Sequence, residues 1–542
     1  MDRGRGQEPQ SRTRRLILPT RRRLLLTRSI LLSSLTLLPF APAMAQTPAA
    51  AEPPAAAAST DSADSRLKAL YEAEWAWRQK EFARRVGDPP FTASADHLPR
   101  VDAATQAARQ AYWQKTLAAL DTIPVDQLSE NEKINAAVFR TSLEAFVAEG
   151  KYRTWEMPFN ADSQFWSGLS ARDSWPSLEE YQRYIGRMQT VAPAYAKLLT
   201  FFKDEYLPKA RTTLAAEAMP DGKAFYQAQI REYTTTALTA EQIHQIGLKE
   251  VARITAEMEV VKEKAGFKGN LAAFIQFLRT DPQFYAKTPE ELLAFSALVA
   301  KRADGQLKYT IGFLPRYRFT ILPVPDAIAP TYTAGRGGLD ACLMNTYDLP
   351  SRPLYQIPAL TLHECVPGHS FQAAVALETT KWPAFRRQTY FSGYGEGWGL
   401  YTEWLGTKMG IYRTPYEDFG RLSFEMWRAS RLVVDTGVHH YGWSREKAID
   451  YLASHTALAQ HDVETEIDRY ISWPGQALAY KLGEITIRRL RADAEAKLGP
   501  KFDQRKFHDT FLALGSVPLP VLEQQLEKFI ADGGEVPTSV AP

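Results

Sequence analysis

The chain has 542 residues, of which 23% are charged and 45% are hydrophobic, and its formal net charge is +3. Its first 45 residues contain nine arginines and two acidic residues, so the remaining chain is slightly acidic, at about −4. This balance excludes a basic nucleic-acid-binding protein, and the roughly 480 residues after position 62 are enough for a large hydrophobic core.

The N-terminal residues 1–45 have the pattern of an export signal. Basic residues precede an apolar run from Ile30 to Ala41, and Ala43-Met44-Ala45 is typical of a cleavage site. The stretch Thr20-Arg21-Arg22-Arg23-Leu24-Leu25 resembles a twin-arginine signal, and an ordinary secretory signal fits it as well. We therefore predict export to a bacterial periplasm, followed by a disordered Ala- and Pro-rich linker at residues 46–62.

The mature chain is predicted to have no stable membrane anchor. No cysteine directly follows the predicted cleavage site, and no later apolar run approaches ~18 residues. A soluble periplasmic protein is expected, and the sequence leaves its oligomeric state open.

Residues 63–310 have a helical pattern almost throughout and predict an N-terminal helical half. Ser129-x-x-Glu132 and Thr239-x-x-Gln242 match the capping box, in which the first side chain and the fourth each bond the backbone of the other. The predicted fold class is mainly α.

A small β element is predicted between Arg316 and Tyr347, where alternating apolar residues, Pro, Gly and Thr replace the helical period. The strand candidates are Phe319–Leu322 and Leu339–Asn345. An edge strand there would bind a substrate backbone, which makes Asn345 and Tyr347 candidate substrate-binding residues. A purely structural hairpin is the alternative.

The chemistry-bearing stretch is His363-Glu364-Cys365-Val366-Pro367-Gly368-His369, inside a predicted buried helix at Ala359–Leu377. Two imidazoles and a carboxylate beside the first are the groups that zinc enzymes of the HExxH type use. We therefore predict a catalytic half at residues 311–542, with the β element beside the metal-binding helix.

The spacing of the two histidines requires a distorted helix. His363 and His369 are six residues apart, which on a regular helix turns the second about 240° away from the first. Pro367 cannot donate the helical hydrogen bond to the carbonyl of His363, and Gly368 permits backbone angles that are closed to other residues. A bulge or kink that returns His369 to the side of His363 is expected.

Five motifs are spread along the mature chain. They are Glu241-x-x-His244-x-x-Gly247-x-x-Glu250-Val251, the histidine stretch, Gly395-Glu396-Gly397-Trp398-Gly399-Leu400-Tyr401, Arg431-x-x-x-Asp435-Thr436-Gly437-Val438-His439, and Arg469-Tyr470-x-x-x-Pro474-Gly475-Gln476-Ala477-x-x-Tyr480-Lys481-x-Gly483. In these motifs the chain resembles the bacterial domain of unknown function 885 family, which is grouped with predicted zinc peptidases. Many relatives have a second histidine after the last one, where this chain has Ser370.

The resemblance implies a large helical fold like that of zinc peptidases, with a deep cleft and a small β element. We predict that Zn²⁺ is held by His363, His369 and Glu396, with the fourth position left for water. Glu364 is the predicted general base. Glu403 lies seven residues after Glu396 on the same helical face, where it would orient a histidine ligand or simply face solvent.

Further candidates come from the same motifs. His439 and Tyr480 are predicted to donate hydrogen bonds to the oxyanion of the attacked carbonyl, with His440 as the alternative to His439 and structural roles as the other reading. Arg431, Arg469 and Lys481 would bind a substrate carboxylate or form ordinary salt bridges.

The two cysteines, Cys342 and Cys365, leave two possibilities open. Paired cysteines in an exported protein usually form a disulfide, whereas a free Cys365 would be a possible zinc ligand.

The predicted activity is that of an exported zinc metallopeptidase, which hydrolyses short peptides by zinc-activated water with Glu364 as the general base. The alternatives are a metal-dependent hydrolase of a non-peptide amide or ester, and a non-catalytic periplasmic binding protein with a vestigial metal site. An intact Glu364 argues against the last, because a binding protein needs no base beside the first ligand.

Overall fold

A computed structural model describes residues 62–82, 100–157, 159–161, 175, 177–326 and 328–537. The chain divides into two units, Met1–Ala57 and Ala58–Pro542, and every described residue belongs to the second. The predicted export signal and all but the last residue of the predicted linker lie outside the described residues.

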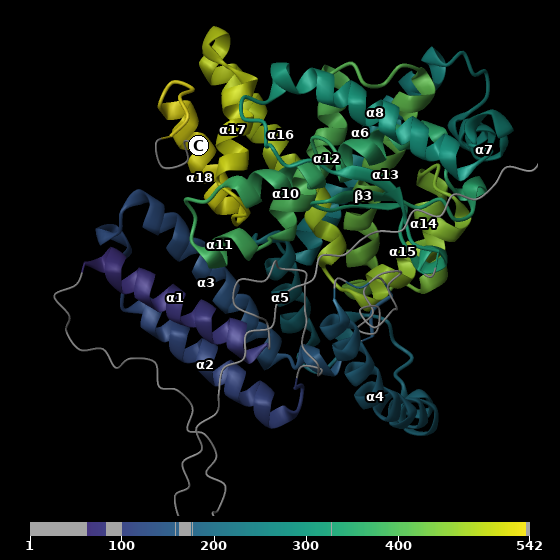
Figure 1. Ribbon diagram of the computed structural model, residues 1–542. Coiled ribbons are helices and arrows are strands. Elements are labelled where there is room, and N and C mark those ends of the chain that lie inside the picture. Colours follow the sequence, from purple (N-terminus) through teal and green to yellow (C-terminus); the bar gives the residue numbers. More distant parts are fainter. Residues whose placement is uncertain are drawn as a thin grey trace, which may run out of the picture. The chain divides into compact units, whose positions relative to one another are not determined.

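The described N-terminal part is helical, as the sequence predicts (Figure 1). Its helices are α1 (Ala63–Glu81), α2 (Ala103–Asp121), α3 (Glu130–Lys151), α4 (Leu178–Phe201), α5 (Gly222–Thr234), α6 (Ala240–Lys264), α7 (Leu271–Thr280) and α8 (Pro289–Thr310). The capping box at Thr239 is confirmed at the start of α6. The one at Ser129 is wrong: its side chain makes no capping bond, and its backbone N–H donates to Asp64 at the start of α1 instead.

The predicted β element is a three-stranded sheet. It consists of β1 (Thr320–Pro323), β2 (Gly335–Gly337) and β3 (Ala341–Met344), in the order β1-β3-β2. Strand β1 is parallel to β3, and β2 is antiparallel to it with Arg336 opposite Leu343. The two predicted strands are confirmed within two residues. Strand β2 was missed because Gly-Arg-Gly has no alternation of apolar side chains.

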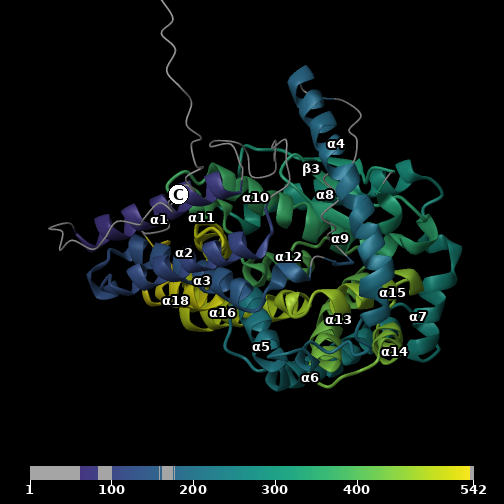
Figure 2. The same ribbon diagram turned by 90° about the horizontal axis from the view of Figure 1, so that it is seen from below.

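The C-terminal part returns to helices, as predicted. They are α9 (Ile357–Glu364), α10 (His369–Glu378), α11 (Ala384–Gln388), α12 (Ser392–Lys408), α13 (Pro415–His439), α14 (Arg445–His455), α15 (Gln460–Ser472), α16 (Ala479–Leu498), α17 (Gln504–Ala513) and α18 (Leu519–Ala531). Helix α13 packs along α6, and α12 packs along α16; Figure 2 shows α13 beside α6. The mainly helical fold class is confirmed.

Helix α13 is buried on all sides from Phe419 to His439 although it carries many charges. The charges lie three or four residues apart and form a stripe on the helix: Arg421, Glu425, Arg428, Arg431 and Asp435. Arg421 pairs with Glu425 on the same helix, whereas Arg428 and Arg431 pair with carboxylates of neighbouring helices and Asp435 accepts a hydrogen bond from a tyrosine hydroxyl. Such partners are needed because an unpaired buried charge would cost several kcal/mol. This charged stripe therefore runs through the interior of the fold.

A single hydrophobic core joins the two parts of the chain. Tyr71 of α1 and Phe139 of α3 both pack on Phe385 of α11, with ring centres 4.9 and 5.5 Å apart. The same core continues to Trp398 of α12. Residues 63–310 and 311–542 therefore share a core that holds the site helices in place.

Candidate metal centre

The helix that carries the two histidines is broken rather than bulged. Helix α9 ends at Glu364 and α10 begins at His369, with non-helical backbone between them. The prediction of one helix over Ala359–Leu377 is therefore wrong, because the distortion expected at Pro367 and Gly368 ends the helix. Its predicted consequence is confirmed: the rings of His363 and His369 lie 4.8 Å apart, nearly perpendicular.

Gly368 is required by the close approach of two backbone segments. A Cβ atom at this position would lie 1.8 Å from the carbonyl oxygen of His363, which is far inside any real contact. The absent side chain lets the chain turn back across the end of α9 and begin α10 beside it.

Gly368→Ala is expected to destabilise the protein by at least about 2 kcal/mol, because the backbone around both histidines must shift. Gly305→Ala is a matched control: this glycine lies in α8 with nothing within 4 Å of an added Cβ, so a gain of roughly 0.5–1 kcal/mol is expected. Denaturant unfolding of the two variants measures the difference. Equal stability would contradict the close approach at Gly368.

Glu396 of α12 joins the two histidines. Its Oε2 lies 3.4 Å from Nε2 of His363 and 3.1 Å from Nε2 of His369, and the three donor atoms all lie within 4.8 Å of one another. Tetrahedral zinc with bonds of about 2.0–2.1 Å holds its ligand atoms roughly 3.3 Å apart. The donor types and their spacing therefore fit a His₂Glu zinc site with three protein donors.

His363, His369 and Glu396 form a charged trio. Interactions within this trio shift the pKa values of its members against the effect of burial. Burial would raise the pKa of Glu396, but the two imidazoles outweigh it and hold this pKa well below its usual range. Burial would lower the pKa of His363, but hydrogen bonds to Glu396 and Glu403 raise it to about 9. A divalent cation would therefore compete with a proton for His363 at neutral pH.

Glu403 holds the far side of the first histidine. Its Oε1 lies 2.8 Å from Nδ1 of His363 and 3.3 Å from Nη2 of Arg428, and both carboxylate and guanidinium are buried. A carboxylate at Nδ1 favours the tautomer with a proton there, which leaves Nε2 free to face the trio. The orienting role predicted for Glu403 fits this geometry, and solvation does not.

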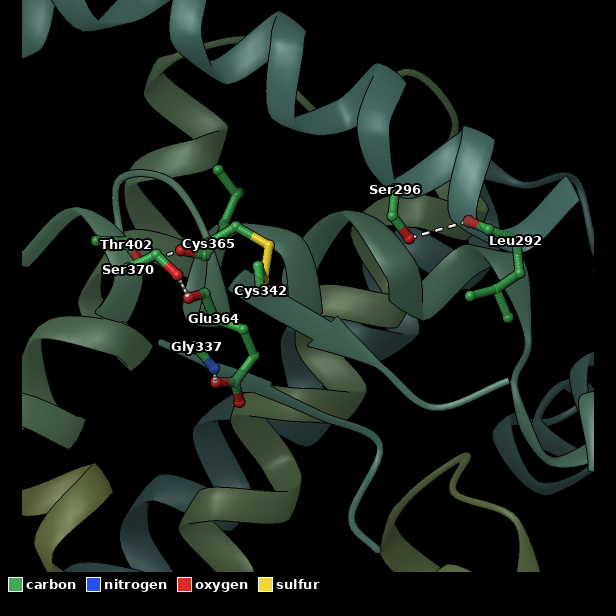
Figure 3. The surroundings of a disulfide bond; sticks show 9 residues. Leu292, Ser296, Gly337, Cys342, Glu364, Cys365, Ser370 and Thr402 are labelled. Carbon is green, nitrogen blue, oxygen red and sulfur yellow. Dashed lines mark hydrogen bonds between the residues drawn. A yellow bond between two sulfur atoms is a disulfide. The ribbon is translucent and has the colours of Figure 1, made fainter. Parts of the chain in front are cut away.

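Glu364, the last residue of α9, points toward strand β2 (Figure 3). Its Oε2 accepts a 2.6 Å hydrogen bond from the backbone N–H of Gly337 in β2. A Cβ on Gly337 would lie 2.0 Å from the carbonyl oxygen of Glu364 and 2.6 Å from Cβ of His369. Strand β2 therefore needs glycine here in order to reach the histidine stretch, and the β element lies beside the site helix as predicted.

The two cysteines form a disulfide that ties β3 to the same stretch. Cys342 and Cys365 have Cα atoms 5.5 Å apart, and Figure 3 shows the bond next to Glu364. Cys365 is therefore not available as a thiolate ligand. Ser370, the residue after His369, donates to the carbonyl of Glu364 at 3.1 Å.

Sequence reasoning missed two side chains at the site. Tyr390 donates a 3.0 Å hydrogen bond to Oε1 of Glu396, the oxygen that faces away from the histidines. Arg428 pairs with Glu403, as described above. The sequence signal for each was position alone: Tyr390 lies six residues before Glu396, and Arg428 lies three before the Arg431 motif.

Tyr480 is the only oxyanion candidate with a contact to the trio among the described residues. Its ring stacks on His363 with centres 6.2 Å apart, and its hydroxyl accepts a hydrogen bond from Arg469 at 3.2 Å. The accepted bond leaves the hydroxyl proton available for donation.

The oxyanion role predicted for His439 is not supported. Nδ1 of His439 accepts from the backbone N–H of Ala216, and Nε2 donates to the carbonyl of Tyr470. Both nitrogens are thus occupied, and burial lowers the pKa of His439 to about 4, so the ring is neutral. The alternative, His440, pairs with Glu217 at 2.8 Å.

Lys481 and Asn345 are also occupied within the fold. Lys481 is fully buried and bonds the carboxylates of Glu250, Glu425 and Glu484 at 2.8–3.0 Å. Lys481 compensates the negative charge of Glu425 in the charged stripe of α13. Its ammonium group is therefore not available to a substrate.

Asn345 donates to three carbonyls of the segment between β1 and β2, and its side-chain oxygen accepts from Tyr347. Tyr347 itself is 50% exposed. Asn345 therefore braces the loop, and the structure places neither residue at the trio. Arg431 and Arg469 both contact Tyr480.

The buried neutral histidines predict a loss of stability in acid. His439 has a pKa of about 4 and His508 a pKa of about 3, both lowered by burial. Below pH ~6.5 the unfolded chain takes up a proton on each of these histidines, and the folded chain does not. Each histidine therefore lowers the free energy of unfolding by about 1.4 kcal/mol for every pH unit as the pH falls towards the folded pKa. Urea unfolding between pH 7 and 5 should show a shallower pH dependence for His439→Gln than for the natural chain. An unchanged slope would show that His439 is protonated in the folded state.

Fold and site together define a mainly helical protein in which two histidines and a glutamate from three helices meet at one point. The chain belongs to the bacterial protein family of unknown function DUF885, whose model matches residues 81–192 and 189–526. No curated protein sequence is similar enough to count as a match.

Two solved structures share the fold. One, described as a "putative lipoprotein" from Colwellia psychrerythraea, has a TM-score of 0.74 and 25% identity, and the similarity covers 87% of this chain and 100% of that one. The other, a "putative lipoprotein of unknown function" from Shewanella oneidensis, has a TM-score of 0.67 and 16% identity over 86% and 100% of the two chains. Within the part of this chain that the structure describes, every helix is too short or too polar to span a membrane.

Proposed function

We propose that this protein is an exported zinc peptidase that hydrolyses short peptides. The observation that carries the proposal is the meeting of His363, His369 and Glu396, with Glu364 directly after His363 and close enough for its charge to act on that imidazole. A binding protein would need the three donors alone, whereas a hydrolase also needs a base beside them.

The residues of this chain divide the reaction among them. A zinc ion at the trio would supply a Lewis acid that acidifies water and polarises the carbonyl group of the substrate. Glu364 takes the proton of the attacking water and passes it to the leaving nitrogen. Its Oε2 is held by Gly337, and its Oε1 accepts no hydrogen bond from the residues that the structure describes. Tyr480 donates to the oxyanion while Arg469 holds its hydroxyl oxygen.

Export has three supports. The N-terminal residues 1–45 have the pattern of an export signal, and both solved structures with this fold are described as putative lipoproteins. A disulfide between Cys342 and Cys365 is also typical of an oxidising compartment. The periplasm is the proposed location.

Glu403→Gln is expected to weaken zinc binding by about 10–100-fold, because His363 would lose the carboxylate that orients it. Zinc affinity measured with a competing chelator tests this. Glu527→Gln, on the exposed side of α18, is the control and should leave the affinity unchanged. Equal affinities in the two variants would remove Glu403 from the site.

The function is tested with the zinc-loaded and the chelator-treated protein on peptides of three to eight residues, with products identified by mass spectrometry. We expect cleavage by the zinc-loaded protein only. Turnover of small amides or esters without any peptide cleavage would replace the proposal by another hydrolase activity. No turnover of any of them would leave a binding protein.

A further inference from the structure

Arg431 is a buried arginine with one end of its guanidinium group unpaired. Nε donates to the hydroxyl of Tyr470 at 2.7 Å, and Nη2 donates to Glu466 at 2.9 Å. The side chain is 2% exposed, yet Nη1 has no hydrogen-bond partner among the described residues. Because Nε and Nη2 share one edge of the planar group, Nη1 lies away from both partners. A buried charged donor of this kind costs free energy unless a ligand satisfies it.

The ring of Tyr480 lies near both the guanidinium group of Arg431 and the ring of His363. Cζ of Arg431 is 4.2 Å from the centre of the Tyr480 ring, and that ring is 6.2 Å from the ring of His363. Arg431 therefore lies within roughly 10 Å of the first metal-ligand candidate, the length of about three extended residues. A peptide with its reacting carbonyl at the trio could reach Arg431 with its C-terminal end.

A small hollow of about 40 Å³ lies near Arg431 and is lined by neighbours of Arg431 rather than by Arg431 or Tyr480. Its wall includes Leu360 from α9, the helix that ends with His363 and Glu364, and Trp427 and Glu466, which flank Arg431. The two acidic groups in the wall are already paired: Glu466 with Arg431 and Arg469, and Asp462 with Arg352. The two guanidiniums outweigh the effect of burial and lower the pKa of Glu466.

We propose that Nη1 of Arg431, beside the Tyr480 ring, binds the C-terminal carboxylate of the substrate, so that the enzyme removes one or a few residues from the C-terminus of a peptide. This inference rests on the proposed peptidase function and names the substrate class. Arg431 would recognise the carboxylate by a charge-assisted hydrogen bond in a site with little water. Lys481, another of the basic candidates, is excluded by its three carboxylate partners.

The test compares pentaalanine with pentaalanine amide, which differ only in the terminal charge. The zinc-loaded natural chain should cleave the acid with a kcat/KM at least about tenfold higher than the amide, the effect of one charge-assisted hydrogen bond. Mass spectrometry should show loss of one to three residues from the C-terminus. Equal rates for the acid and the amide, or products released from the N-terminus, would overturn the inference while the peptidase function stands.

Variants separate the role of Arg431 from folding. Arg431→Lys should bring the acid-to-amide ratio near one, mainly through a slower reaction of the acid. Arg386→Lys, an equally buried arginine of α11 that bonds Asn135 and Leu514, should keep the ratio of the natural chain. If Arg431→Lys does not fold, the ratio of the natural chain alone decides.

A binding measurement works without turnover. Calorimetry of the Glu364→Gln variant with the two peptides should show tighter binding of the acid by about tenfold. If neither peptide is cleaved by the natural zinc-loaded chain, the peptidase function fails, and this measurement alone decides whether a carboxylate subsite exists. Equal binding of both peptides would then remove the subsite.

Discussion

Glu364→Gln is expected to lower kcat for peptide hydrolysis by about 10²–10⁴-fold and to leave zinc bound, because glutamine cannot take a proton from water but keeps the shape of the side chain. Its amide oxygen can still accept the hydrogen bond from Gly337. Steady-state cleavage and metal analysis of the same preparation measure both effects.

The control for this substitution is Glu263→Gln, on the exposed C-terminal end of α6. It removes the same charge far from the histidine stretch in sequence and should change neither rate nor metal content. Full activity in Glu364→Gln would remove Glu364 as the base. Loss of zinc in that variant would show instead that Glu364 helps to hold the metal.

Glu396→Ala is expected to reduce zinc affinity by more than about 100-fold, beyond the effect of removing an outer partner such as Glu403. The loss follows because Glu396 Oε2 is the atom that approaches both imidazoles, at 3.1 and 3.4 Å. Chelator competition measures the affinity, and circular dichroism shows whether the helices persist.

A second variant separates ligand loss from misfolding. Glu396→Asp keeps the charge but shortens the side chain by one methylene, so it should bind zinc more weakly than the natural chain and more tightly than Glu396→Ala. Equal zinc binding in the natural chain and in Glu396→Ala would mean that the third donor is another residue.

The sequence predicts that the two histidines meet because the signals for this meeting are local, whereas Glu396 was chosen from a separate motif farther along the chain. His363 and Glu364 are neighbours in the sequence. Pro367 and Gly368 indicate that a regular helix is interrupted between the two histidines. The helical class and two of the three strands follow from periodicity. What periodicity does not carry is the extent of the distortion, which depends on the close approach of Gly368 to the carbonyl of His363.

The errors concern polar side chains whose partners lie far away in the chain. Lys481, Asn345 and His439 have the chemistry of a binding or catalytic group, but each is satisfied by residues that only the fold brings near. Tyr390 and Arg428 were missed because nothing in their residue type marks them as site residues. Their contacts with Glu396 and Glu403 exist only in the folded chain. Residue type and spacing alone cannot separate the two cases.

The most direct measurement is a crystal structure of the zinc-soaked protein with diffraction data collected at the zinc absorption edge. We expect one anomalous peak within about 2.0–2.2 Å of Nε2 of His363, Nε2 of His369 and a carboxylate oxygen of Glu396. A protein that takes up no zinc, or a peak bound by other residues, would contradict the account.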